Sequence, residues 1–401
     1  MKFVHCADCH IGGWKEEKLR NLGMESFRTM ISFCISEKID FLLIAGDLFN
    51  TALPQIDLIK ETVSELKRLK DQAIPIYMIP GSHDFSPSGK TMLDVFEKAG
   101  LIINVSKMQE VDGKINLAFT NHKDIKITGI YGKKGGLEKT FYESLDPSSL
   151  EKENGFKIFM FHTALTEFKP KDLESLDSLS VASLPRNFNY YAGGHVHYIF
   201  EQLKEGYGLI TFPGALFPNN FKELEEFKHG SFFILNLNNG ILNHELKKIK
   251  LKEVLSLDID INNLTPIQAQ EKIIALIKNS EIKDKIITLR IHGILSSGKK
   301  SDINLNEILE QFNEAYIILK NTSKVTMKEF ESHDIEIKNI DEVENTLIEK
   351  SESNLNIKNM TKEQQSELVK QMMEIFNKEK LEGEKNADFE LRILEEANKL
   401  L

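Results

Sequence analysis

Carboxylate and imidazole side chains recur in five short segments of the first half of the chain, each directly after a predicted strand. In order, the segments are Asp8-Cys9-His10, Gly46-Asp47, Gly81-Ser82-His83-Asp84, Phe161-His162-Thr163 and Gly194-His195-Val196-His197. Oxygen and imidazole ligands suit hard or borderline divalent ions such as manganese. Two such ions held close together support in-line attack on phosphorus. The residue types therefore predict a phosphoesterase site.

The predicted strands and helices indicate how these segments can meet. Short apolar runs predict buried strands at residues 2–7, 41–45, 74–80, 157–161 and 189–192. Between them, apolar residues at three- and four-residue spacing predict helices at 25–38 and 56–69. Alternating strands and helices are typical of a layered α/β domain. The candidate ligands then follow the carboxyl ends of the strands, where open α/β sheets bind their ligands.

Each segment taken alone also has an ordinary explanation. A polar pair after a strand is usually a turn or a helix cap, and a single histidine usually belongs to the core or the surface. The pair His195 and His197 is the strongest element, because residues two apart on an extended segment project to the same side. The occurrence of all five segments in this order favours a metal site over five separate ordinary explanations.

Two other motifs resemble known sites and are set aside. Residues 6–10 match the attachment pattern of c-type haem. That chemistry requires export, and the N-terminus lacks the charged, apolar and small-residue regions of a secretory signal. Residues 293–299 nearly fit a phosphate-binding loop, but Lys300 stands where a serine or threonine is required. We interpret this second motif as a hairpin loop.

Composition limits the cellular setting. The three cysteines cannot form a disulfide framework, and no apolar run approaches the length of a transmembrane helix. We therefore expect a protein of the reducing cytoplasm that has no membrane partner. The net charge of −10 argues against a generic nucleic-acid binder. However, residues 331–401 hold 18 acidic and 10 basic residues, so the rest of the chain carries only −2 and nucleic acid is not excluded.

The second half of the chain predicts further units. Two strands are predicted at 209–212 and 231–237. Beyond them we expect a small α+β domain, which contains a strand at 250–261, a helix at 265–278, a strand at 285–292, a helix at 305–312 and a strand at 315–319. Polar residues then predict a linker, and two amphipathic helices separated by Gly383 predict a helical hairpin. We expect a phosphoesterase domain at 1–245, a capping domain at 246–330, a linker at 331–360 and the hairpin at 361–401. The hairpin either folds back on its own domain or docks on a partner.

The five segments, together with residues 5–12 and 45–49, resemble the calcineurin-like metallophosphoesterase superfamily. Within it, the chain resembles SbcD-type nucleases, the prokaryotic form of the "meiotic recombination eleven" nuclease of double-strand break repair. The resemblance is specific over about residues 1–240. It implies a four-layer α/β/β/α sandwich with a capping domain, acting as a metal-dependent nuclease on double-stranded DNA ends near the nucleoid. It also implies a homodimer that binds an SMC-like coiled-coil ATPase through residues 361–401.

The resemblance also implies roles for individual residues. The first metal would be held by Asp8, His10, Asp47 and His197, with Asp47 bridging, and the second by His162, His195 and the weaker ligand Ser82. These ions would be two Mn²⁺, with Mg²⁺ as the alternative. His83 would stabilise charge or protonate the leaving oxygen, and Asn50 and Asp84 would line the site wall.

Two positions depart from the pattern of the family. Ser82 stands where an asparagine ligand is usual, and Asn50 stands where some members have a histidine that assists the exonuclease reaction. Two alternatives therefore stay open. One is a small-molecule phosphodiesterase of the same fold, and the other is a catalytically weakened scaffold that anchors the ATPase to DNA.

Overall fold

The computed structural model describes the chain except for residues 87–88, 174–175, 328–360, 377, 379–385 and 401. The described residues form two compact units, Met1–Thr326 and Met327–Leu401. The predicted linker at 331–360 lies outside the described residues.

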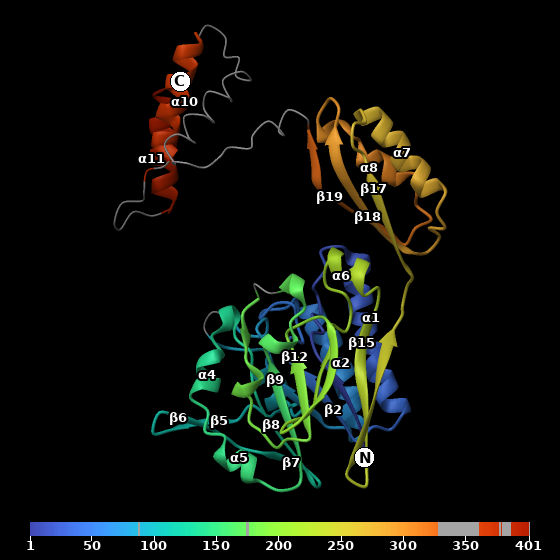
Figure 1. Ribbon diagram of the computed structural model, residues 1–401, viewed down its shortest axis with the longest axis vertical. Helices are drawn as coiled ribbons and strands as arrows, with labels where there is room; N and C mark the ends of the chain where they lie inside the picture. The colour runs from blue at the N-terminus through green and yellow to red at the C-terminus, as the bar shows by residue number, and fades with distance from the viewer. Residues whose placement is uncertain (87–88, 174–175, 328–360, 377, 379–385, 401) are drawn as a thin grey trace. The chain divides into compact units, whose positions relative to one another are not determined.

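A six-stranded sheet in the order β16-β15-β1-β2-β3-β4 contains the first three predicted strands (Figure 1). Strands β1 to β4 are parallel, and β15 and β16 extend one edge as antiparallel strands. Their bounds are β1 Lys2–Cys6, β2 Phe41–Ala45, β3 Ile76–Ile79, β4 Ile103–Asn104, β15 Gly230–Asn238 and β16 Ile241–Ile249. In β2, Phe41 and Leu43 enter one apolar core while Leu42 and Ile44 enter another, so the strand is buried on both faces.

A second six-stranded sheet has the order β13-β14-β12-β9-β8-β7, in which the four central strands are parallel. Its strands are β7 Thr120–His122, β8 Ile125–Ile130, β9 Phe156–His162, β12 Tyr190–Gly194, β13 Ile199–Lys204 and β14 Gly208–Pro213. Two short pairs lie outside it, namely β5 Met108–Val111 with β6 Lys114–Leu117, and β10 Ala164–Leu165 with β11 Ser178–Leu179.

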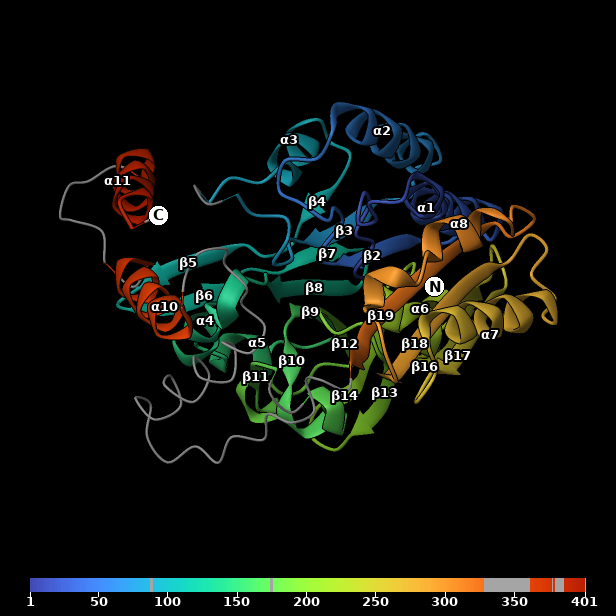
Figure 2. The same cartoon turned by 90° about the horizontal axis from the view of Figure 1, so that it is seen from above.

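The two sheets pack face to face and helices cover their outer faces (Figure 2). Phe41 of the first sheet and Tyr190 of the second share the core between the sheets. Helices α1 Glu17–Ser36, α2 Ile56–Asp71 and α3 Leu93–Lys98 cover the first sheet. The short helices α4 Lys139–Glu143 and α5 Ser148–Lys152 pack on the second. This order of layers confirms the predicted α/β/β/α sandwich.

A smaller α+β layer follows the sandwich. It contains β17 Val254–Asp260, α7 Pro266–Lys278, β18 Ile286–Leu295, α8 Leu305–Glu310 and β19 Ile317–Met327, around an apolar core of its own. The Thr265 and Gln268 side chains form a capping box that starts α7. Arg290 of β18 forms an ion pair with Glu225 of helix α6 Phe221–Glu226, at 2.5 Å. The capping layer is therefore tied to the sandwich at α6.

The described residues of the second unit include the helices α10 Lys362–Phe376 and α11 Asn386–Asn398. Thr361 and Gln364 form a capping box at the start of α10, because they exchange backbone-to-side-chain hydrogen bonds of 2.9 and 3.3 Å. Ile375, Ile393 and Ala397 form a small buried cluster between the helices. The predicted helical hairpin therefore has a core, but a small one.

Several predicted boundaries were wrong, for identifiable reasons. Helix α1 begins at Glu17 rather than at residue 25, because Leu19 and Leu22 pack in a buried cluster with Phe217 despite the glycine at 23. β19 continues to Met327 as an edge strand with polar residues. Residues 293–295 are the end of β18, and residues 296–300 lead on towards α8 rather than forming a hairpin loop.

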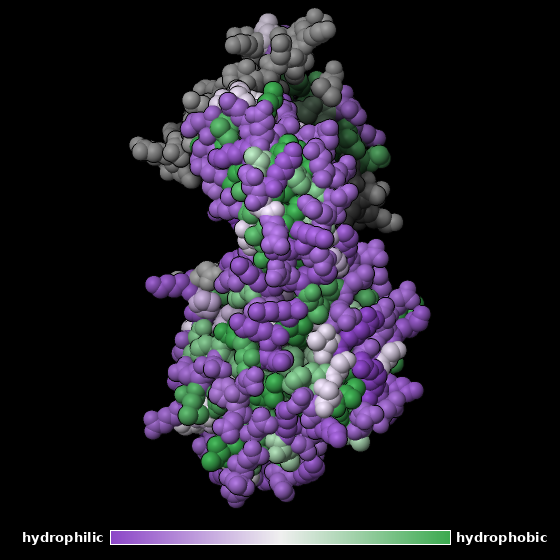
Figure 3. All heavy atoms as spheres, turned by 90° about the vertical axis from the view of Figure 1, so that its right-hand side faces the viewer, coloured by the Kyte–Doolittle hydropathy of each residue, from purple (hydrophilic) through white to green (hydrophobic). Residues whose placement is uncertain are grey.

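The molecular face in Figure 3 is mostly hydrophilic, with hydrophobic residues in small groups among polar ones. This pattern agrees with a composition of 28% charged residues. Within the described residues, no helix combines the length and apolar character that crossing a bilayer requires.

Candidate metal centre

The loops after β1 and β2 are joined to each other by their backbones. The Asp8 and His10 amides donate to the carbonyl oxygens of Gly46 and Asp47, at 3.1 and 3.0 Å. Because β1 and β2 are parallel neighbours, both loops leave the same edge of the sheet. The structure therefore brings the first two predicted segments together.

The remaining segments reach the same place from β3 and from the second sheet. The His83 amide donates to Oδ1 of Asp47 at 2.8 Å, which joins the loop after β3 to that after β2. In the second sheet, the last residue of β9, His162, lies opposite Gly194 at the end of β12. The His195 amide then donates to both Asp8 carboxylate oxygens, at 3.1 and 3.0 Å. All five segments therefore meet.

Four of the seven predicted ligands have a left-handed backbone. The φ angles are +51° for Asp8, +41° for His10, +52° for Asp47 and +89° for His195. Residues other than glycine rarely adopt this region, and each such residue costs on the order of 1–3 kcal/mol. This conformation turns the chain sharply where a buried strand ends. Strained residues gather at functional sites, so the backbone supports a site independently of the side chains.

Two glycines leave the space that the site requires. A Cβ atom at Gly46 would lie 2.2 Å from Nδ1 of His162, and one at Gly81 would lie 2.2 Å from Oδ1 of Asp47. Neither neighbour can move away, because both are buried. The glycines that precede Asp47 and Ser82 in the sequence are therefore needed for close packing around the ligands.

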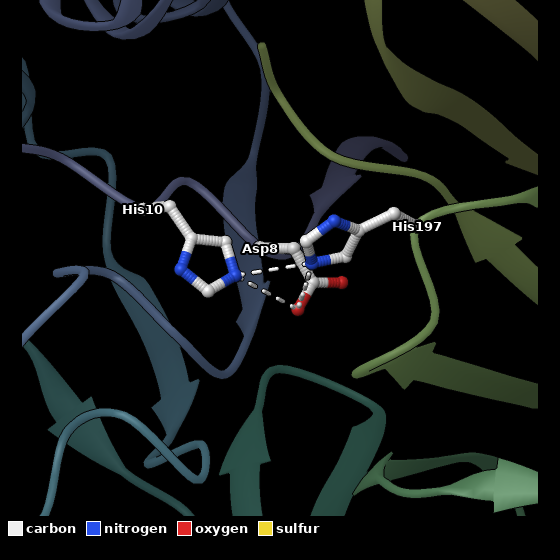
Figure 4. Close-up of side chains that lie close together, drawn as sticks. All are labelled: Asp8, His10 and His197. Carbon is white, nitrogen blue, oxygen red and sulfur yellow. Dashed lines mark hydrogen bonds and ion pairs between the residues drawn. The ribbon is translucent and has the colours of Figure 1, made fainter. Parts of the chain in front are cut away.

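Asp8, His10 and His197 form the first ligand group (Figure 4). Nε2 of His10 lies 3.1 Å from Nε2 of His197 and 4.0 Å from Oδ1 of Asp8, and Nε2 of His197 lies 3.9 Å from that same oxygen. Figure 4 shows the two imidazoles entering from opposite sides and converging on the carboxylate. The three atoms surround a position that one cation can occupy.

Asp47 takes part in two further groups, one with His10 and His83 and one with Asp8 and His162. Its Oδ2 lies 3.6 Å from Nε2 of His10 and 3.2 Å from Nε2 of His162. One carboxylate oxygen thus faces imidazoles from both sheets. This central position is the one expected of a bridging ligand.

The site holds buried carboxylates whose charge is balanced only by histidine. Asp8 and Asp47 are 0% and 2% exposed, and all of their ion pairs among the described residues are with imidazoles. Burial raises the pKa of Asp8 to about 7, although the nearby positive charge of His197 acts to lower it. Burial alone would also raise the pKa of Asp47, but His162 beside it outweighs that effect and holds the pKa below its usual range. Buried carboxylates are stable only when they are paired with positive charge or coordinate a metal ion.

Two of the histidines, His162 and His197, have raised pKa values. Burial alone would lower the pKa of His162, but the Asp47 carboxylate outweighs burial and raises that pKa to about 10. The pKa of His197 rises to about 9 against burial, through Glu223 and Asp8. The two imidazoles carry the positive charge that a divalent cation would otherwise supply.

The orientation of His162 fits a metal ligand. Its Nδ1–H donates to the carbonyl oxygen of Ala45 at 2.8 Å, so the lone pair of the neutral ring is on Nε2. That Nε2 atom is buried, faces Asp47 and has no hydrogen-bond partner among the described residues. An outer hydrogen bond that fixes the tautomer is usual for metal-binding histidine. The donor set and this unsatisfied atom fit divalent metal ions.

His83, like His162, is oriented by a hydrogen bond to a backbone carbonyl oxygen. Its Nδ1–H donates to the backbone oxygen of Asn50 at 2.8 Å, and its ring meets that of His10 edge-on, with 4.8 Å between centroids. The Asp84 carboxylate accepts from the Gly81 and Phe49 amides, at 2.8 and 3.3 Å. Asn50 and Asp84 thus join the loops around His83.

Two predicted ligands lie at the margin of the groups. The Ser82 hydroxyl donates to Oδ2 of Asp47 over a long 3.5 Å. The His195 ring lies 5.2 Å from that of His162, between centroids, but its nitrogens belong to none of the three groups of close ligand atoms. Burial lowers the pKa of His195 to about 3, so this ring is neutral and has a free lone pair.

Glu223 is a functional residue that the sequence analysis missed. Its Oε1 lies 2.8 Å from Nδ1 of His197, and its Oε2 accepts from the Asn219 amide at 2.7 Å. In the sequence, Asn220 and Glu223 have the spacing of a helix cap, and the Asn220 side chain does cap α6. That signal predicts a helix start and gives no indication of the contact with His197.

Comparisons with known proteins agree with this site. Residues 1–198 match the family model described as calcineurin-like phosphoesterase. The chain is 28% identical over 262 residues to the DNA double-strand break repair protein Mre11 of Methanococcus maripaludis, covering 63% of this chain and 67% of that one. It is 25% identical over 339 residues to the Mre11 protein of Sulfolobus acidocaldarius, covering 82% and 84% of the two chains.

The Mre11 protein of Thermoplasma acidophilum is 26% identical over 309 residues, which cover 73% of this chain and 77% of that one. The family match contains all five metal-site segments, the last of which ends at His197. Residues 1–198 of this chain therefore match a calcineurin-like phosphoesterase domain, and that stretch contains all of the candidate metal ligands.

Proposed function

We propose that this chain is a metal-dependent DNA nuclease of double-strand break repair that hydrolyses phosphodiester bonds. The observation that carries the proposal is the place of Asp47 in two ligand groups, one with His10 and one with His162. One carboxylate can then serve two neighbouring cations. The similarity to archaeal Mre11 proteins over up to 82% of the chain supports DNA as the substrate.

The cofactors would be two Mn²⁺ ions, with Mg²⁺ as the alternative. The residues that would hold them are Asp8, His10, Asp47 and His197 for one ion, and Asp47, His162, His195 and Ser82 for the other. Bound ions would polarise the phosphodiester and offset its developing negative charge. The protein residues supply rigid placement, since the ligand backbones are tied together between strand ends.

His83 would act on the substrate itself. Because its Nδ1–H is taken by the Asn50 carbonyl, only Nε2 is available to the substrate. When the ring is protonated, Nε2–H can donate to the oxygen that leaves phosphorus. The hydrogen bond to Asn50 fixes the ring plane, so proton transfer occurs at one defined atom.

The remaining units would serve assembly. We propose that residues 1–245 form the nuclease domain and that residues 246–330 form a domain that caps the DNA site. Residues 331–360 would be a linker to residues 361–401, which would bind an SMC-like coiled-coil ATPase. A homodimer acting on double-stranded DNA ends in the nucleoid is part of the same proposal. The three cysteines are free thiols, which suits a reducing cytoplasm.

The direct test offers purified protein linear duplex DNA, hairpin DNA and a small phosphodiester, each with Mn²⁺ or with chelator. We expect cleavage of DNA only with the metal. Efficient cleavage of the small phosphodiester alone would instead support a small-molecule phosphodiesterase.

Ser82 favours a second candidate, a weakened nuclease that serves as a scaffold for the ATPase. The Ser82 side chain is short, and its hydroxyl makes a long hydrogen bond to Asp47. Ser82→Asn would extend a ligand oxygen towards the second ion. A large gain of activity at limiting Mn²⁺ would support the scaffold role for the wild-type chain, and equal activity would oppose it.

A further inference from the structure

A cavity of about 480 Å³ has none of the candidate metal ligands among its described lining residues. Its walls include the rings of Phe85 and Tyr131, the side chains of Lys133 and Lys134, and Leu137. This volume is within the roughly 300–1,000 Å³ of small-ligand pockets. Leu137 is 62% exposed, so an apolar side chain stands open at the rim.

Both walls of the cavity are continuous with the metal centre. Phe85 directly follows Asp84, whose carboxylate is bound within the ligand loops. Tyr131 directly precedes Gly132, and a Cβ atom at Gly132 would lie 2.5 Å from Cδ2 of His162. The two aromatic residues of the cavity are therefore each one residue along the chain from a segment that packs in the metal centre.

Aromatic rings form one side of the cavity. The Phe85 and Tyr131 centroids are 5.1 Å apart with the rings tilted by 48°, and Tyr131 is again 5.1 Å from Phe141. Neither Phe85 nor Tyr131 is fully buried. Partly exposed neighbouring rings offer flat apolar faces to a planar ligand.

The charge of the cavity is positive. Lys133 and Lys134 line it, and its lining residues within the described part of the chain include no acidic side chain. Nζ of Lys133 lies 4.2 Å from the Phe141 centroid, so the cation is held at the aromatic side. By contrast, the larger cavity between residues 227 and 285 contains Glu253, which pairs with Lys285 at 3.0 Å.

We propose that this cavity binds an unpaired nucleobase of the DNA strand whose phosphate is at the metal centre. The rings would stack on the base, and the two lysines would contact its flanking phosphates. Stacking tolerates every base, so the pocket would select unpaired DNA without selecting sequence. A base inside a duplex must leave its stack to enter. This inference rests on the proposed nuclease function and assigns its preferred substrate as single-stranded or frayed DNA.

The test measures binding by fluorescence anisotropy in chelator, where no cleavage occurs. The probes are a labelled single strand of mixed sequence and a strand of equal length with abasic units in place of the bases. We expect wild type to bind the normal strand more tightly. Phe85→Leu and Tyr131→Leu should weaken that binding by about 5- to 100-fold, the range for lost base stacking. Neither should alter abasic binding, because the charges are unchanged.

Two variants control for damage to the fold. Tyr131→Phe keeps the ring and should keep the preference for bases. Phe200→Leu removes a ring that stacks on Phe168 outside the cavity, at 4.5 Å between centroids, and should leave binding unchanged. Thermal unfolding checks each variant.

Equal binding of both strands by wild type, or full binding by Tyr131→Leu, would overturn the pocket. Cleavage of duplex DNA with Mn²⁺ is measured in parallel. This measurement separates failure of the pocket proposal from failure of the nuclease proposal. Wild type that cleaves DNA without preferring bases contradicts only the pocket, whereas protein that neither binds nor cleaves DNA contradicts the nuclease proposal itself.

Discussion

The Glu223 carboxylate lies 2.8 Å from Nδ1 of His197, and the opposite ring nitrogen of His197 faces Asp8 and His10. This hydrogen bond places the proton on Nδ1 and leaves Nε2 as the ligand atom. Helix α6, which carries Glu223, is also held by the Arg290 pair with Glu225. The small α+β layer thus contacts the same helix that orients His197, a candidate metal ligand.

Glu223→Gln should weaken the binding of Mn²⁺ by about 10- to 100-fold, the usual loss for an outer partner of a metal-binding histidine. The amide keeps the shape but removes the charge that orients His197. Calorimetric titration with Mn²⁺ measures the change. Glu226→Gln, an exposed position on the same helix, is the matched control and should bind as wild type does. Equal affinity of both variants would mean that His197 needs no carboxylate.

Asp47→Ala should abolish cleavage and reduce the number of bound ions, because Asp47 belongs to two ligand groups. Titration calorimetry should give two ions for wild type and fewer for the variant. Asp57→Asn removes a carboxylate that is 85% exposed on α2 and should change neither value. Retained cleavage by Asp47→Ala would be incompatible with a shared carboxylate.

His83→Ala should differ from the ligand variants. Metal binding should remain nearly intact, because His83 is anchored to Asn50, while the rate of cleavage should fall by about 10²–10⁴-fold, as for a lost acid–base group. Rate measurements at saturating Mn²⁺ separate the two effects. Loss of an ion on this substitution would make His83 a ligand instead, as its proximity to His10 and Asp47 allows.

The positions of the candidate ligands in the sequence could be predicted, but the conformation of their backbone could not. Buried strands such as β2 are visible in the sequence because both of their faces are apolar. Asp47 is visible because a carboxylate directly after such a strand is unusual. The left-handed φ angles of Asp8 and His195 arise from contacts with distant loops and leave no local signal. Glu223 is similar, since its partner is 26 residues away.

The less regular parts of the fold were missed for a related reason. The hairpin β5 and β6 is largely exposed and carries polar residues on both faces, so it has no apolar period. β13 follows the ligand His197 almost directly and has exposed residues such as Leu203. Edge strands of this kind are set by pairing with a neighbour rather than by their own sequence.

Without metal, the protein should lose stability as the pH rises from about 7 to 10. His162 and His197 have pKa values raised to about 10 and 9. Their stabilisation is complete below the unfolded pKa of about 6.5 and is lost as the pH passes the folded values. Added Mn²⁺ should reverse the trend, because metal binds the deprotonated rings. Melting temperatures in chelator and in Mn²⁺ at several pH values would show this, and a flat profile in chelator would contradict it.

Deleting residues 361–401 should leave the nuclease fold intact and remove binding to the ATPase. Residues 327–401 are assigned to a second compact unit, so we expect the first unit to fold without residues 361–401. The hairpin buries only a small cluster around Ile375, Ile393 and Ala397, whereas Leu391 and Leu394 are 60% and 59% exposed. Short helices are marginal in water, and laying such an apolar face on a coiled coil would bury it.

The comparison uses melting temperature, nuclease activity and co-purification with a coiled-coil ATPase, for the full chain and the deletion. Leu391→Glu with Leu394→Glu in the full chain is the matched variant, since it charges the exposed face and spares the buried cluster. We expect both proteins to cleave DNA and to melt as the full chain does, and both to lose the ATPase. A large fall in melting temperature on deletion, with the ATPase still bound by the charged variant, would show that the hairpin packs on its own chain.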